Sequence, residues 1–122
     1  MSSEISSYVK IQMANGFGVG NFSADNTIDQ SAQGKVDSIQ EIGFAAHEAI
    51  ALGDLSVPGV FGFRNLDATH YVEIGLDVSA VFRPLIQLLP GEAASGRFAA
   101  GAVPYAKANT AAVKLNVFAL ES

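Results

Sequence analysis

The sequence predicts an all-β fold: a single-domain antiparallel β-sandwich or jelly-roll-like barrel with about seven or eight strands and little helix. Three observations predict it. Hydrophobicity alternates with a period of two, turn-forming residues recur at roughly ten-residue spacing, and helical periodicity is scarce. The chain has 122 residues, of which 49% are hydrophobic, and this length supports one continuous core but not two. We expect a flexible polar arm over residues 1–7 and the sandwich over residues 8–122.

The clearest strand is predicted over residues 71–78, where every second residue is apolar. The side chains expected to face the core there are Val72, Ile74, Leu76 and Val78. Residues 8–13 alternate in the same way and place Val9, Ile11 and Met13 inward. Residues 113–120 begin similarly, but Phe118 and Leu120 interrupt the polar side, so we expect this end to be covered on both faces. Shorter strands are predicted at residues 36–45, 59–66, 84–89 and 97–100.

Turn residues separate these strands at Asn15-Gly16 and at residues 56–59, 65–67 and 89–92, because they supply positive φ or a preset bend. Residues 45–52 have the composition of a helix, yet they span only two turns and could equally extend the strand that begins near residue 36. Residues 21–34 are polar and rich in turn formers. They predict a long loop with at most one irregular strand at residues 27–29.

Charge and composition exclude several classes of function. The formal net charge is −5, and the seven basic residues are scattered singly, so we expect no direct contact with nucleic acid. The acidity is concentrated in residues 1–61, which carry 7 acids and 2 bases. The absence of cysteine excludes disulfides, thiolate metal sites and a cysteine nucleophile. The sequence shows neither an export signal nor a membrane span, and we therefore expect a product made in the cytoplasm that does not enter a membrane.

No motif predicts an enzyme, a cofactor or a metal site. The glycines at 16, 18 and 20 lack the Lys-Ser/Thr of a phosphate loop, and they suit a bent, tightly packed strand. The acidic and amide groups of residues 25–29 lack the ligand spacing of a calcium loop. His47 and His70 show no metal spacing and no conspicuous acid partner, although Glu48 beside His47 and Asp67 near His70 leave such a partner open. Among the carboxylates, Glu41, Glu73 and Asp77 are the set that an outer sheet face could bring together.

The second half of the chain resembles small virion structural proteins of tailed bacteriophages. The residues that carry the resemblance are "RNLD" at 64–67, "YVEIG" at 71–75, "LPGE" at 89–92 and "YAKA" at 105–108, followed by a final strand. Such proteins include capsid cement, or decoration, proteins, many of which are β-sandwiches or barrels that sit as dimers or trimers across capsomer boundaries. The resemblance covers about the last 70 residues. It implies a non-enzymatic protein on the capsid exterior whose partner is the major capsid protein.

The leading hypothesis is therefore a cement protein that self-associates, as a trimer or dimer, and clamps neighbouring major capsid subunits. The residues expected at its partner interface are Phe61, Phe63, Arg64, Phe82, Arg83, Arg97 and Phe98. The alternative is a binding module of a tail, neck or fibre that recognises a surface carbohydrate or another tail component. Tyr71, Glu73 and Tyr105 are the side chains that would suit a sugar site. A small barrel enzyme or metal-binding protein is the third possibility.

Overall fold

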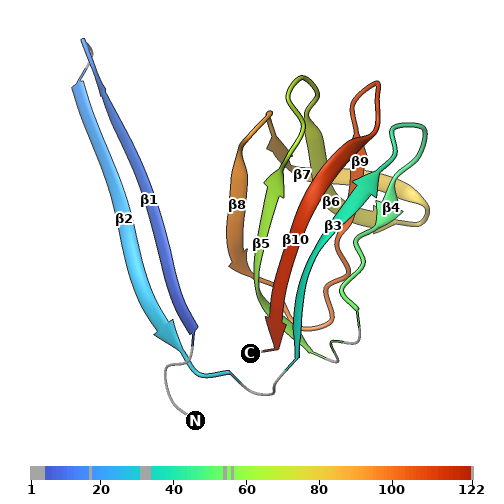
Figure 1. The fold of residues 1–122 in the computed structure, drawn as a ribbon, viewed down its shortest axis with the longest axis horizontal. Helices are drawn as coiled ribbons and strands as arrows, with labels where there is room; N and C mark the ends of the chain where they lie inside the picture. The colour runs from blue at the N-terminus through green and yellow to red at the C-terminus, as the bar shows by residue number, and fades with distance from the viewer. Residues whose placement is uncertain (1–4, 17, 31–33, 54, 56, 122) are drawn as a thin grey trace.

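The computed structural model describes residues 5–16, 18–30, 34–53, 55 and 57–121. Within these ranges all regular structure is β-strand, as Figure 1 shows, and there is no helix. The ten strands are β1 (Ile5–Asn15), β2 (Gly18–Ile28), β3 (Lys35–Ile42), β4 (Glu48–Ala49), β5 (Pro58–Asn65), β6 (Val72–Val78), β7 (Val81–Leu88), β8 (Ala93–Arg97), β9 (Tyr105–Ala108) and β10 (Val113–Glu121). The predicted all-β class is confirmed.

Eight of these strands form two four-stranded sheets that pack face to face (Figure 1). One sheet has the order β3-β10-β5-β8 and the other has the order β4-β9-β6-β7, with every pair antiparallel. The predicted sandwich is therefore confirmed, but the described residues form ten strands where seven or eight were expected, because β1 and β2 pair outside the sandwich. The pairing is nested: β3 pairs with β10, β4 with β9, β5 with β8 and β6 with β7.

The core lies between the two sheets and is built from alternate residues of the central strands. In β10, Val113, Leu115 and Val117 are fully buried, while Lys114 points outward, as the alternation predicts. In β6, Val72 and Ile74 are buried against them. Burial of each such side chain contributes about 1.5–3 kcal/mol, so this alternation is the main source of stability.

The inward assignment of Leu76 and Val78 is wrong, because both are exposed. A bulge between Ile74 and Gly75 shifts the register against β7, and the apolar side chains of β6 beyond it do not belong to the core. Gly75 is required at the bulge, since a Cβ there would lie 2.0 Å from the carbonyl oxygen of Arg83. The strand prediction is confirmed here, but only its first half faces the core.

Strands β1 and β2 form a separate two-stranded hairpin, which we call the arm, that projects away from the sandwich (Figure 1). The ladder runs in register from Ile5 opposite Ile28 to Asn15 opposite Gly18. Residues 21–28, predicted as a loop, are therefore strand, because pairing with β1 satisfies their backbone whatever their side-chain polarity. The glycine-rich segment lies at the exposed hairpin turn, where a Cβ at Gly16 or Gly18 would meet nothing within 4 Å. The expected tight packing there is wrong.

The observed division of the chain differs from the expected one. The sequence predicted a flexible polar segment over residues 1–7. Of these residues, 1–4 lie outside the described ranges, and 5–7 belong to β1 and so to the arm. The sandwich begins at Lys35 and not at residue 8. The base of the arm is fixed, since Ile5 is buried and Gln30 Nε2 donates to the carbonyl oxygen of Gly34 at 3.2 Å. Consequently Val9, Ile11 and Met13, expected inward, lie outside the core.

Three further boundaries are corrected or settled. Residues 45–52 contain bends and the short strand β4 and no helix. The strand predicted at residues 97–100 lies earlier, over β8, because its partner β5 is met from residue 93 onward. The turn at 89–92 is confirmed: Glu92 N donates to the carbonyl oxygen of Leu89 at 2.9 Å, and Gly91 has a φ of 82°.

The β6–β7 hairpin turn holds two non-glycine residues in the left-handed region, Ser79 at a φ of 53° and Ala80 at 68°. A two-residue turn of this kind favours Asn-Gly. The double substitution Ser79→Asn with Ala80→Gly is expected to raise the free energy of unfolding by about 1 kcal/mol, because it relieves backbone crowding. Chemical denaturation measures this. The matched control is Ala93→Gly in the exposed strand β8, which is expected to lower the free energy of unfolding by about 0.5–1 kcal/mol. If the turn variant also lost stability, backbone crowding at the turn would be contradicted.

Candidate functional site

Three of the residues expected at a partner interface lie together inside the sandwich. The rings of Phe61 and Phe98 stack with centroids 4.3 Å apart, and Phe63 lies 4.9 Å from Phe61. Phe63 is only 2% exposed, and the other two pack against the same core. Phe61 and Phe63 are two positions apart in β5, so both side chains point to the side of the strand that faces the second sheet. Phe63 is thus a core residue and is not accessible to a partner of the folded chain.

The remaining four expected residues are spread over the molecule. Arg64 is exposed on the outer face of β5, and Arg97 is exposed on the neighbouring strand β8. Arg83 is exposed on β7 in the other sheet, whereas Phe82 is half-buried beneath the ring of His47. The structure therefore does not bring the seven predicted residues into one surface. Among these four residues, only Arg64 and Arg97 share a sheet face.

An open groove of about 730 Å³ lies between the arm and the outer face of the β3-β10-β5-β8 sheet, and we call it the arm groove. Its wall is residues 8–11 of β1. Its floor includes Asp37, Gly62, Arg64, Ser95, Asn116 and Phe118. The charged groups of the floor are thus one acid, Asp37, and one base, Arg64.

The arm carries an apolar face that sequence reasoning assigned to the core. Because residues opposite each other in the ladder point to the same side, Val9, Ile11 and Met13 share this face with Phe22 and Ala24. We call these five side chains the apolar face of the arm. Ile11 is 63% exposed and its cross-strand partner Phe22 is 57% exposed. The signal for this face was present in the alternation of residues 8–13, but the returning strand was missed because residues 21–28 are polar.

Phe118 and Leu120, which interrupt the polar side of β10, point away from the core toward the arm. Both are half-buried, and together with Ile5 and Gln30 from the base of the arm they line a second hollow of about 550 Å³. The expectation that this end is covered on both faces is therefore met only in part. The arm shelters these side chains without packing them fully.

His47 belongs to a cluster on the outer face of the β4-β9-β6-β7 sheet. Its Nε2 lies 2.7 Å from Oδ2 of Asp77, and its ring stacks on Phe82 with centroids 5.4 Å apart. Tyr105 approaches the same ring from the side at 5.5 Å. The expectation that neither histidine has an acid partner is wrong, because the connection between β3 and β4 carries His47 across to β6. The cluster holds a loop onto the sheet.

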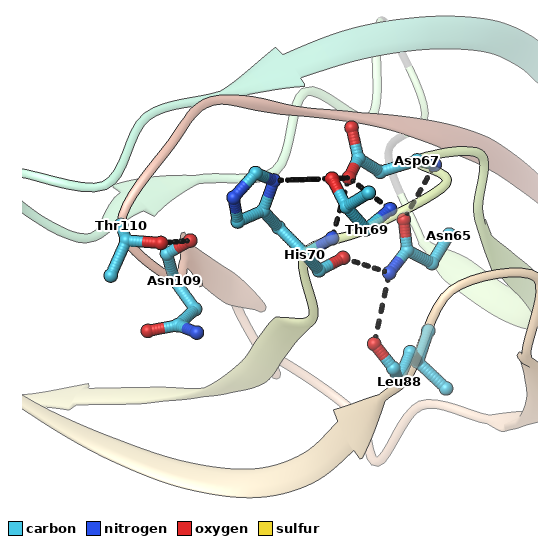
Figure 2. A network of polar contacts seen from close by, with 7 residues as sticks. All are labelled: Asn65, Asp67, Thr69, His70, Leu88, Asn109 and Thr110. Atoms are coloured by element: carbon cyan, nitrogen blue, oxygen red, sulfur yellow. Dashed lines mark hydrogen bonds and ion pairs between the residues drawn. The ribbon is translucent and has the colours of Figure 1, made fainter.

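The segment "RNLD" forms the corner between the end of β5 and the connection to β6, and Asn65 is its buried residue (Figure 2). The side chain of Asn65 is fully buried and donates from Nδ2 to the carbonyl oxygens of His70, at 2.9 Å, and Leu88, at 3.0 Å. Its Oδ1 accepts from Asp67 N at 2.8 Å. Oδ2 of Asp67 in turn accepts the backbone N–H groups of Thr69 and His70. The side chains of Asn65 and Asp67 therefore have a structural role.

The carboxylates of Asp67 and Asp77 are expected to make the stability of the fold depend on pH. Hydrogen bonds from the backbone of Thr69 and His70 lower the pKa of Asp67 below its ordinary value of 3.8. The hydrogen bond from His47, followed by that from Ala80 N, lowers the pKa of Asp77 in the same direction. A carboxyl group whose pKa is lower in the folded chain than in the unfolded chain stabilises the fold. This stabilisation is complete at pH values above the unfolded-state pKa, and it is lost as the pH falls through the folded-state pKa.

We therefore expect the free energy of unfolding to fall as the solution is acidified below about pH 4, from the ordinary carboxyl range downward. Asp67→Asn and Asp77→Asn are each expected to be less stable at neutral pH and to lose less on acidification. Denaturant titrations at several pH values measure both effects. Asp25→Asn on the exposed arm makes the same change in charge without these hydrogen bonds; acid profiles unchanged in all three variants would contradict the prediction.

The three carboxylates considered for catalysis do not converge. Glu41 lies on β3, whereas Glu73 and Asp77 lie on β6 in the other sheet, so the three do not share a face. Of the residues considered for sugar binding, Glu73 and Tyr105 lie on the same outer face, because Tyr105 pairs with Gly75, two residues along β6 from Glu73. Tyr71 precedes β6. Among the described residues no group of three or more His, Asp or Glu side chains is placed to hold a metal ion. Asp25 and Asn26, considered for calcium, are adjacent in β2 and so alternate between its two faces.

Comparison with known proteins returned no match: no family model, no curated protein and no solved structure is similar to the chain. In the described ranges no helix is long and apolar enough to cross a membrane.

Proposed function

We propose that this protein is a non-enzymatic virion structural protein of a tailed phage, a capsid cement protein that self-associates and clamps neighbouring major capsid subunits from the outside. The observation that carries the proposal is the arm, which holds large apolar side chains beyond the sandwich. A surface of that kind is typical of a protein that binds other proteins. The proposal places the arm and the arm groove at contacts with neighbouring subunits.

The architecture supports this role. The nested pairing of the eight sandwich strands is the arrangement expected of a jelly roll, a scaffold used by viral capsid domains. The sandwich supplies a rigid body, and the arm extends its reach. On a symmetric shell many weak contacts of this kind act together, because each bound subunit raises the effective concentration of the next contact.

The test is cosedimentation of the purified protein with empty shells of its parent particle, combined with light scattering of the free protein. We expect saturable binding to shells and a mass above that of one chain. A protein that remains monomeric and does not bind shells would exclude the cement role. A glycan panel tests the alternative directly, because a cement protein is expected to bind no sugar; specific binding of a carbohydrate would favour the tail, neck or fibre module.

A further inference from the structure

The apolar face of the arm has no cover within the described part of the chain. Ile11 and Phe22 face the same side in register, and both are more than half exposed. An isolated two-stranded hairpin is at best marginally stable in water, and it requires packing against another element. The arm is anchored at its base by Ile5 and Gln30, but its far end stands clear of the sandwich (Figure 1). A second molecule packed on this face would supply the cover that it lacks.

The same chain offers a receiving surface in the floor of the arm groove. Phe118 lies opposite Gly62 in the ladder between β10 and β5. A Cβ on Gly62 would meet nothing within 4 Å, so the floor has an open depression beside the Phe118 ring. Ser95, opposite Gly62 on β8, adds only a small side chain. An Ile or Phe side chain from an incoming strand fits such a depression without displacing any part of the sandwich.

The two surfaces also match in size. Lys10 and Asp25, the charged residues near the middle of the arm, lie on the face opposite to its apolar face, because they alternate with Val9, Ile11 and Ala24 along their strands. They therefore stay in solvent when the apolar face is covered. The arm has two strands of 11 residues each, which is close to the roughly 20–30 residues that one side of a stable interface contributes.

We infer that the arm groove receives the arm of a second copy of this chain, so that associated copies exchange arms. The apolar face of the incoming arm covers Gly62 and Phe118, while Lys10 and Asp25 on its other face remain exposed to solvent. This inference rests on the self-association in the proposed function and specifies the surface through which it occurs. It requires no capsid, and its test is made with the purified chain alone.

The absence of cysteine from the sequence allows a direct cross-linking test. The full-length variant Ile11→Cys, on the arm, is mixed with the variant Ser95→Cys, on the floor, and oxidised. We expect the mixture to give disulfide-linked dimers of one chain of each kind, because arm and floor of different copies meet. Ile11→Cys mixed with Gln87→Cys, on the outer face of β7 in the opposite sheet, is the matched control. Equal linkage to both positions, or linkage of Ile11→Cys only to itself, would overturn arm exchange.

A binding measurement provides the second test. The double variant Ile11→Ser with Phe22→Ser is expected to raise the dissociation constant of self-association by tenfold or more, since it removes apolar area from the interface. The control is the double variant Gln12→Ala with Asn21→Ala, which changes a cross-strand pair on the opposite face of the arm. It is expected to raise the dissociation constant less than threefold. An unchanged constant in the first variant would refute the inference. Specific cross-linking without shell binding would leave arm exchange intact and reject only the cement role.

Discussion

Replacing Phe63 by alanine is expected to lower the free energy of unfolding by about 3–5 kcal/mol, because it removes a fully buried ring and leaves a cavity among Phe61, Phe98 and the core. The measurement is chemical denaturation at a protein concentration low enough to keep the chains dissociated. A loss this large is a substantial part of the stability of a domain of this size. The result distinguishes a core position from a partner contact, which would cost far less in the free chain.

Phe22→Ala is the matched control, since it removes the same ring from an exposed position on the arm. We expect it to change the unfolding of the dissociated chain by less than about 0.5 kcal/mol. It is expected to weaken self-association instead. If Phe63→Ala and Phe22→Ala had equal effects on unfolding, the placement of β5 with Phe63 inward would be wrong.

Asn65→Ala is expected to lower the free energy of unfolding by about 3 kcal/mol, because three backbone groups lose their partner in a buried corner. Asn116→Ala is the control. It removes the two hydrogen bonds that the Asn116 side chain donates to Asp37 and to the carbonyl oxygen of Ser38, but these bonds are exposed, so water replaces them. That variant is expected to cost less than about 1 kcal/mol. Equal losses in the two proteins would show that burial of the corner is not the cause.

Asn65→Asp adds a pH signature to the same test. A carboxylate at this position would face the carbonyl oxygens of His70 and Leu88, to which the amide now donates. We expect this variant to be least stable at neutral pH and to recover part of its loss on acidification, when the carboxyl group regains a proton to donate. A variant whose deficit is independent of pH would contradict the assigned direction of these hydrogen bonds.

Local patterns in the sequence predicted much of the sandwich. The alternation in residues 113–117 identified both the strand and its inward face, because burial of one face imposes a period of two wherever the strand lies in the sheet. The Pro-Gly pair at residues 90–91 identified a turn, since its backbone preferences are intrinsic to those residues. Such features depend on neighbours a few positions away.

Other elements could not be predicted from local patterns. Residues 21–28 form β2 although their composition suggests a loop, because the backbone of β1 provides the pairing. Leu76 and Val78 continue the alternation of Val72 and Ile74 but are exposed, so identical alternation has a different outcome at the two ends of β6. The acid partner of His47 lies 30 positions away and was invisible to any search for nearby spacing.

The candidate site shows the same division. The sequence by itself determined the all-β class, most strand positions, and the pairing of Phe61 and Phe63 on one side of their strand. Only the tertiary structure decided that this side is the core, that Arg64 faces the arm groove, and that the alternating residues of β1 remain uncovered on the arm. The physical reason is that alternation specifies two faces of a strand, whereas the strands and sheets that pack against it decide which face is buried.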